Sequence, residues 1–206
     1  MERRDFLQKP ILAGAVIAAA TLPYGFSRLL APRGETGAAA RRRNVLRPPG
    51  ALKDANAFTA ACIGCGVCGE VCPPRCIQFH ARDGGGAVNT PVIVAAEKAC
   101  TLCGKCMEAC PTEALTPTPR DRIDMGVAEI ERTACYPWVD RGICGACVSI
   151  CPLGAKAISF KLWNQYRPII RSGCIGCGLC VEVCPHPSKP IWIAKRQLGA
   201  KGYRHG

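Results

Sequence analysis

The chain has 206 residues, 17 of them cysteine, and a formal net charge of +12. This length allows one or two compact domains once a leader is set aside. The basic balance suggests an anionic partner, but no basic motif interleaved with aromatic residues occurs, so we exclude nucleic-acid binding.

Residues 1–40 have the pattern of an export signal. Arg3 and Arg4 precede an apolar run from Ile11 to Leu22, which is short for a bilayer span and has the length of a signal core. The alanines at 38–40 offer a cleavage site, and an uncleaved anchor fits the same residues. The arginine pair indicates the twin-arginine route, which exports proteins already folded. We therefore expect the protein on the periplasmic side of a bacterial inner membrane.

Residues 41–57, "RRRNVLRPPGALKDANA", are predicted to form a linker. The segment is basic and contains Pro48, Pro49 and Gly50, which favour turns. Its arginines follow a hydrophobic stretch, a position typical of contact with an anionic membrane surface. The chain is therefore expected to be membrane-associated.

Four cysteine quartets follow, and three of them share the spacing C-x2-C-x2-C-x3-C-P. This spacing places three sulfurs on one tight loop and the fourth on the helix that follows, as in bacterial-type ferredoxins that hold [4Fe–4S] clusters. The fourth cysteine of such a run ligates the other cluster of a pair. The three regular quartets are Cys62, Cys65, Cys68, Cys72; Cys100, Cys103, Cys106, Cys110; and Cys174, Cys177, Cys180, Cys184.

The remaining quartet has a longer first gap. It consists of Cys135, Cys144, Cys147 and Cys151, and the loop "YPWVDRG" enlarges only the space between the first two. All four cysteines and the following proline are kept, so we interpret this motif as a further cluster site. The sequence thus predicts sixteen iron ligands and four [4Fe–4S] clusters.

Disulfide bonds and zinc fit this number of cysteines less well than iron–sulfur clusters do. A disulfide framework would not repeat ligand-spaced quartets along the chain. Zinc sites use separated C-x2-C pairs and not three cysteines within seven residues. Four oxidised clusters would also lower the net charge by about 8, to roughly +4, which weakens the case for a phosphate partner.

Short apolar runs flank the quartets. "PVIVAAEKAC", "GVAEIERTAC" and "RPIIRSGC" lead into three of them, and "CIQF", "EALT", "KAISFKL" and "PIWIAK" follow the four in order. A strand, a cluster loop, a short helix and a strand make up half of a ferredoxin. The fold class is therefore α+β, with two ferredoxin-like units from four half-repeats over residues 58–198 and a flexible tail at 199–206. Few aromatic residues are available for a core, so the protein without iron should be poorly folded.

Two arrangements of the half-repeats are possible. In the sequential one, the first quartet exchanges its fourth ligand with the second, and the third with the fourth. In the nested one, the middle two pair with each other and the outer two do the same. Because no strand-like run leads into Cys62, the sequence favours the nested arrangement.

Several residues lie outside the quartets. Cys76 is predicted to be a small buried residue that opens the strand "CIQF", and not a ligand. His80, His186 and His205 lack catalytic neighbours in the sequence. Trp138, in the long third loop, either shields a cluster from water or packs as an ordinary loop residue.

The order of the quartets, the long gap in the third, the "LRPPGAL" segment before Cys62 and the leader resemble the NapG/MauM-type ferredoxin proteins. The resemblance spans about Leu46 to Lys195 together with the leader. Such proteins accompany periplasmic nitrate reductase and methylamine dehydrogenase systems. The resemblance implies iron ligation by the sixteen quartet cysteines, a polytopic membrane iron–sulfur partner, and a periplasmic redox enzyme or cytochrome as the second partner.

The sequence therefore predicts an electron-transfer protein with four clusters and no substrate site of its own, and hence not an enzyme. It would relay electrons between a membrane quinol-linked iron–sulfur protein and a periplasmic redox enzyme. The alternative is a maturation or assembly factor for a periplasmic oxidoreductase. In a deletion strain, a partner enzyme lacking its cofactor would indicate the assembly factor.

Overall fold

The computed structural model describes residues 44–81, 87–161 and 166–196. The chain separates into two units, Met1–Gly37 and Ala38–Gly206, and all described residues belong to the second. The predicted leader at 1–40 and tail at 199–206 lie outside the described residues. Within the described ranges, no helix has the length and apolar character needed to cross a membrane.

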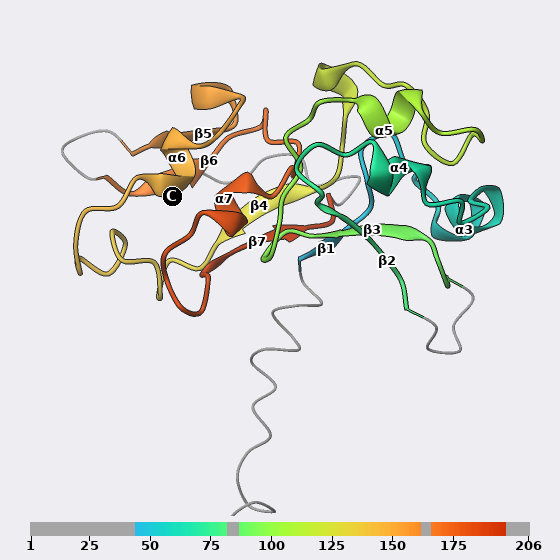
Figure 1. Cartoon of the computed structure of the whole chain (residues 1–206). Coiled ribbons are helices and arrows are strands. Elements are labelled where there is room, and N and C mark those ends of the chain that lie inside the picture. The colour runs from blue at the N-terminus through green and yellow to red at the C-terminus, as the bar shows by residue number, and fades with distance from the viewer. Residues whose placement is uncertain (1–43, 82–86, 162–165, 197–206) are drawn as a thin grey trace, which may run out of the picture. The chain divides into compact units, whose positions relative to one another are not determined.

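The elements form two successive halves (Figure 1). The first half contains β1 (Val45–Leu46), α3 (Ala55–Ala61), α4 (Val67–Glu70), β2 (Ile77–Phe79), β3 (Pro91–Val94), α5 (Lys105–Glu108) and the 3-10 turn η1 (Arg120–Arg122). The second half contains β4 (Val127–Ile130), α6 (Ala146–Ser149), the 3-10 turn η2 (Gly154–Lys156), β5 (Ile158–Phe160), β6 (Pro168–Ile170), α7 (Leu179–Glu182) and β7 (Ile191–Ala194). All strands pair antiparallel, in the orders β1-β3-β2, β4-β7 and β5-β6.

Both halves share one plan, an inner hairpin enclosed by an outer pair. In the second half, β5 and β6 form the hairpin, and β4 pairs with β7 across the whole half. In the first half, β2 and β3 form the hairpin, and the outer pair is reduced to a single bridge between Ala51 and Leu115. Each half therefore closes on itself around two consecutive quartets.

Most of the predicted strands are confirmed. The three runs that lead into quartets become β3, β4 and β6, and three of the runs that follow become β2, β5 and β7. The exception is "EALT", where Leu115 forms only the isolated bridge.

The described part of the predicted linker, residues 44–57, is an integral part of the fold. Val45 and Leu46 pair with β3, and Pro48 and Pro49 are fully buried. The Arg47 guanidinium donates hydrogen bonds to the carbonyls of Leu52, Lys53 and Asp54. The prolines that suggested a linker are therefore core residues. The Arg47 guanidinium provides hydrogen-bond donors for backbone carbonyls of the turn that follows them.

The core runs through both halves and is rich in sulfur. It includes aliphatic side chains such as Ile93 and Val181, which are fully buried. It also includes seven cysteines that are themselves buried: Cys68, Cys72, Cys76, Cys100, Cys106, Cys174 and Cys177. Because these thiols lie in the core, we expect the packing of the core to depend on the group that the thiols bind.

Candidate metal centres

The sixteen quartet cysteines surround four cavities, with four of them at each cavity. Each set takes three cysteines from one quartet and the fourth from a neighbouring quartet. Site 1 consists of Cys62, Cys65, Cys68 and Cys110; site 2 of Cys72, Cys100, Cys103 and Cys106; site 3 of Cys135, Cys144, Cys147 and Cys184; and site 4 of Cys151, Cys174, Cys177 and Cys180. The structure thus brings together every cysteine that the sequence predicted as a ligand.

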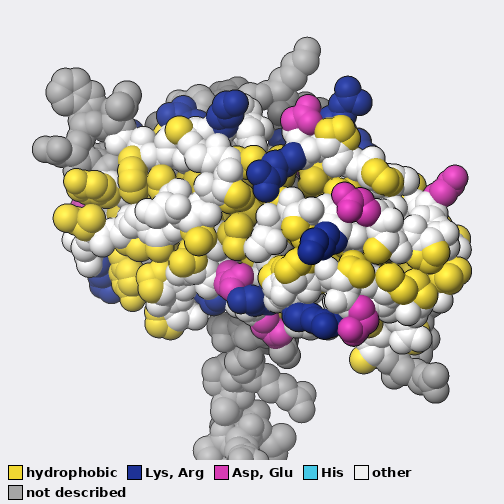
Figure 2. All heavy atoms as spheres, turned by 45° about the horizontal axis from the view of Figure 1, so that its top comes forward, with side chains coloured by type: hydrophobic (Ala, Val, Ile, Leu, Met, Phe, Trp, Pro, Cys, Tyr) yellow, Lys and Arg dark blue, Asp and Glu magenta, His cyan; other side chains and the backbone are white. Residues whose placement is uncertain are grey.

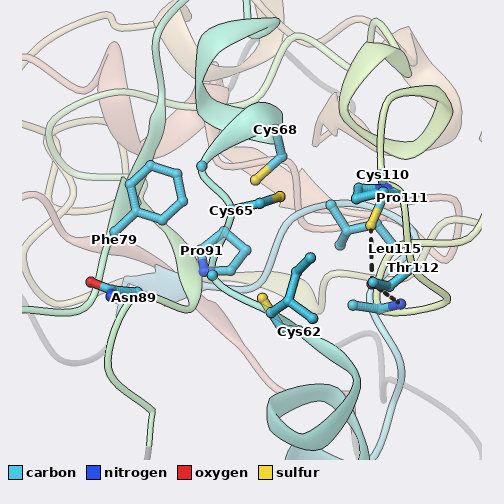
Figure 3. Close-up of a pocket in the computed structure, with 14 residues that line it drawn as sticks. Cys62, Cys65, Cys68, Phe79, Asn89, Pro91, Cys110, Pro111, Thr112 and Leu115 are labelled. Atoms are coloured by element: carbon cyan, nitrogen blue, oxygen red, sulfur yellow. Dashed lines mark hydrogen bonds between the residues drawn. The ribbon is translucent and has the colours of Figure 1, made fainter.

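Figure 3 shows site 1, where the side chains of Cys62, Cys65, Cys68 and Cys110 approach one space from different elements. Three of them come from the loop and helix around α4, and Cys110 comes from just beyond α5. The Cys110 thiol also contacts the Thr112 hydroxyl at 3.6 Å. The site is therefore built from two quartets and cannot form from one alone.

These sets show that the nested arrangement favoured by the sequence is wrong. Cys72 and Cys110 exchange between the first two quartets, and Cys151 and Cys184 exchange between the last two. The pairing is sequential. The first quartet does have a leading segment, since Ala51 bridges Leu115 and closes the first half, but "LRPPGAL" has no alternating apolar pattern that would identify it.

A left-handed glycine starts the short helix at three of the four sites. Gly66, Gly104 and Gly178 precede α4, α5 and α7 with φ of 80°, 82° and 87°. A residue with a Cβ adopts this conformation only at a cost, so glycine permits the turn that aims the loop sulfurs inward. Before α6 the corresponding Gly145 has φ −134°, so the third motif enters its helix differently.

The long loop of the third motif is held from outside site 3. Trp138 lies under the Arg132 and Arg167 guanidinium groups, 4.4 and 5.6 Å from its ring centroid, and its indole N–H donates to the Pro168 carbonyl at 3.1 Å. Pro137 lines the site 3 cavity, and Trp138 is not among the described residues that do. The structure therefore favours loop packing over shielding for Trp138.

Burial and neighbouring thiolates raise the pKa values of several thiols at these sites. Burial raises the pKa of Cys68 and of Cys177 to about 11, and that of Cys106 and of Cys147 to about 12, with further contributions from neighbouring cysteines. For Cys147, these neighbours are the three other cysteines of site 3. Four neighbouring thiolates, some of them buried, need a positively charged partner, and iron provides one.

The donor sets fit [4Fe–4S] clusters. Each cavity has four quartet cysteines, and site 2 also has Cys76; no other side chain that binds iron is among the lining residues. This is the soft, all-sulfur set that such clusters take. Four quartet thiols at every site indicate one kind of occupant.

Backbone amides contact two of the ligand sulfurs. The Leu102 N–H donates to Cys100 Sγ at 3.3 Å, and the Ala128 N–H donates to Cys174 Sγ at 3.4 Å. Such bonds tune a cluster's potential. Ala128 lies in β4, far from Cys174 in the sequence, so no local pattern could have identified it.

Sites 2 and 4 meet where the two halves join. The Cys100 N–H donates to the Cys177 carbonyl at 3.2 Å. Beside this bond, the Ala99 N–H donates to a Glu182 carboxylate oxygen at 2.7 Å, and Lys98 Nζ lies 3.0 Å from the other oxygen. A ligand residue of each site therefore takes part in the junction itself.

The remaining predicted residues have non-catalytic surroundings. His186 packs against Tyr136 with ring centroids 4.6 Å apart, and its Nδ1 accepts from the Ser188 N–H at 3.1 Å. The prediction for Cys76 is confirmed in that it is buried and lies directly before β2. The sequence did not reveal that it also contacts site 2. The neighbouring Cys76 thiol lowers the pKa of Cys100. The neighbouring Cys100 thiol, followed by burial, raises the pKa of Cys76.

Comparison with known proteins agrees with this geometry. A 4Fe–4S dicluster domain family matches residues 61–114, 99–155 and 142–188. The methylamine utilization ferredoxin-type protein MauM of Methylophilus methylotrophus is 37% identical over 172 residues, which cover 78% of this chain and 75% of that protein. MauM of Methylobacillus flagellatus is 35% identical over 167 residues (75% and 70%), and the ferredoxin-type protein NapG of Haemophilus influenzae 31% over 174 residues (81% and 58%). The chain belongs to this MauM and NapG family of ferredoxin-type 4Fe–4S proteins.

Proposed function

We propose that this protein carries four [4Fe–4S] clusters and transfers electrons across its length in the site order 1, 2, 4, 3. When bound, such a cluster accepts and releases one electron. The supporting observation is the hydrogen bond between Cys100 of site 2 and Cys177 of site 4. It connects the pair of sites 1 and 2 to the pair of sites 3 and 4, so that the four sites form one series.

Contacts within each half support the rest of this order. In the first half α4 packs against α5, and the quartets that carry them exchange Cys72 and Cys110. In the second half α6 packs against α7, with the exchange of Cys151 and Cys184. Sites 1 and 2 are therefore neighbours, as are sites 3 and 4, and the junction adds the step from 2 to 4.

Exposure of the ligand loops supports sites 1 and 3 as the ends of the series. Ile63 in the site 1 loop is 69% exposed and Ile143 in the site 3 loop is 80% exposed, whereas Leu102 and Ile175 at sites 2 and 4 are 6% and 7% exposed. Among the ligands themselves, Cys65 of site 1 and Cys103 of site 2 are exposed, so the distinction rests on the apolar loop residues and not on the sulfurs. Figure 2 shows hydrophobic side chains at both sides of one face, with lysine and arginine between them. Exposed apolar loops at two end sites suit transient contact with redox partners.

The proposal extends to partners and location. We propose that one end receives electrons from a polytopic membrane iron–sulfur protein linked to quinol, and that the other delivers them to a periplasmic redox enzyme or cytochrome. The predicted twin-arginine leader supports a position on the periplasmic side of the bacterial inner membrane. We propose that the protein has no substrate site of its own and is not itself an enzyme.

The first test is the iron and acid-labile sulfide content of protein purified without oxygen. The proposal predicts about sixteen irons per chain, four at each four-cysteine site. A Cys144→Ala variant should lose about four of them, and the matched Cys76→Ala variant should lose none, since Cys76 belongs to no set. About twelve irons in the unaltered protein would mean that the long-gap quartet does not hold a cluster.

The second test distinguishes transfer from assembly. In a host lacking this protein, transfer predicts that the partner enzyme is fully assembled with its cofactor but is not supplied with electrons. Complementation with Cys177→Ala, which disables the interior site 4, should fail to restore this supply. A partner enzyme without its cofactor would support an assembly role instead.

A further inference from the structure

Cys76 is a fifth cysteine at site 2. It is 1% exposed and lines the same cavity as the four cysteines that form this set. Its Sγ lies 3.5 Å from Cys72 Sγ, and Cys100 lines the same cavity. A non-ligand thiol thus contacts one ligand sulfur within the site 2 cavity.

The other three sites show what this position ordinarily holds. Cys76 directly precedes β2, and the residue directly before the corresponding strand or bridge is Ala114, Ala157 or Pro190. Each of these lines the cavity that contains the fourth cysteine of its own quartet. The equivalent place is therefore occupied by an aliphatic group at sites 1, 3 and 4 and by a thiol at site 2.

The thiol group distinguishes Cys76 from the residues at the equivalent positions. Ala114 and Ala157 are buried like Cys76, and each lines its own cavity. A methyl group or a proline ring offers no hydrogen, whereas a neutral thiol is a weak donor. Because site 2 already has one cysteine from Cys72 and three from the second quartet, the additional thiol is free to donate.

We propose that Cys76 is a positioning and tuning residue of site 2, which donates an S–H···S hydrogen bond to the ligand sulfur of Cys72. A hydrogen bond to a ligand sulfur stabilises the more negative, reduced state and so raises the reduction potential of that site. This inference rests on the proposed cluster at site 2. Since site 2 is interior to the series, the effect is to make it a better acceptor from site 1.

The experiment is a redox titration of the full-length, iron-loaded protein and two variants, followed by the spectra of the reduced clusters. Cys76→Ala places at site 2 the residue found at the equivalent positions 114 and 157, so the fold should tolerate it. We expect an unchanged iron content and a lowering of one of the four midpoint potentials. The reduction equilibrium should change by up to about tenfold, which is ~59 mV for a one-electron couple.

Two companion variants make the result specific. Cys76→Ser keeps a hydrogen-bond donor, so its potential should lie nearer to that of the unaltered protein than that of Cys76→Ala. Ala114→Cys places a thiol at the equivalent position of site 1 and should raise a different potential.

The proposal is overturned if all four potentials of Cys76→Ala match those of the unaltered protein. It is also overturned if Cys76→Ala loses about four irons, since Cys76 would then be a ligand. A low iron content in the unaltered protein would instead refute the proposed four-cluster function, so the two failures are distinguishable.

Discussion

The same five residues, Cys-Ile-Gly-Cys-Gly, occur at 62–66 and at 174–178 with opposite surroundings. At site 1, Ile63 is exposed and Gly66 has open space beside it. At site 4, Ile175 is buried and its carbonyl accepts from the Met125 N–H at 2.9 Å. The loop sequence thus determines how sulfurs are presented, and contacts made elsewhere in the chain determine whether the site is an end or an interior point.

Removal of iron should abolish this difference altogether. Six of the predicted ligand cysteines are buried in the core, and without metal their sets are neighbouring thiols with no group to enclose. We expect chelation of the iron to eliminate the cooperative unfolding transition and to make the amides at 62–66 and 174–178 exchange with solvent equally fast. Near-ultraviolet circular dichroism and hydrogen exchange measure these effects. Retained protection of 174–178 in the iron-free protein would contradict the prediction.

Truncation of the two isoleucines should show the largest difference between single variants. Ile175→Ala removes a buried side chain and should destabilise the protein by about 3 kcal/mol. Ile63→Ala removes an exposed one and should change stability by less than about 0.5 kcal/mol. Guanidinium unfolding of the iron-loaded proteins measures both. Equal effects would show that Ile63 is covered in solution.

Alanine substitutions at Gly66 and Gly178 should distinguish the cost of backbone strain from the cost of a clash between the two halves. Gly66→Ala and Gly178→Ala each carry the strain of positive φ, about 1 kcal/mol. At Gly178 the new Cβ would also lie 2.5 Å from the Ala95 Cβ, in the other half, which should add about 2 kcal/mol. The midpoint of guanidinium unfolding should therefore fall further for Gly178→Ala. A similar loss in both variants would mean that the halves are not tightly joined at this point.

The two matched glutamates should give the smallest difference. Glu182 binds the Ala99 N–H and Lys98 across the junction, so Glu182→Gln should cost about 1 kcal/mol. Glu70, at the same place in the first quartet, pairs with Arg75 at an exposed position, so Glu70→Gln should cost less than about 0.5 kcal/mol. High salt should reduce both effects. A larger loss of stability for Glu70→Gln than for Glu182→Gln would contradict the assignment of site 4 as interior and site 1 as an end of the series.

The sequence was sufficient for what depends on spacing. The sixteen predicted ligands and six of the seven flanking strands follow from cysteine intervals and short runs of Val and Ile. The sequence was insufficient for the pairing of the quartets, which depends on contacts between distant parts of the chain. The bridge between Ala51 and Leu115 determines the pairing of the first half, and two buried prolines precede it in a segment that has the composition of a linker. The Ile175 carbonyl accepts from the Met125 N–H, which lies about fifty positions away in the chain, and no local sequence pattern predicts this contact.

Sites 2 and 4 must adjoin across the contact between Cys100 and Cys177 if the four sites are to form one series. The decisive experiment is electron paramagnetic resonance of the reduced double variant Cys65→Ala, Cys144→Ala, in which sites 1 and 3 are disabled and about eight irons should remain. We predict a spectrum broadened by spin–spin interaction between the two remaining clusters. The matched variant Cys103→Ala, Cys144→Ala retains sites 1 and 4 and should show narrower signals. Two independent, unbroadened signals in the first variant would contradict the proposed order, because the two halves would then not form one series.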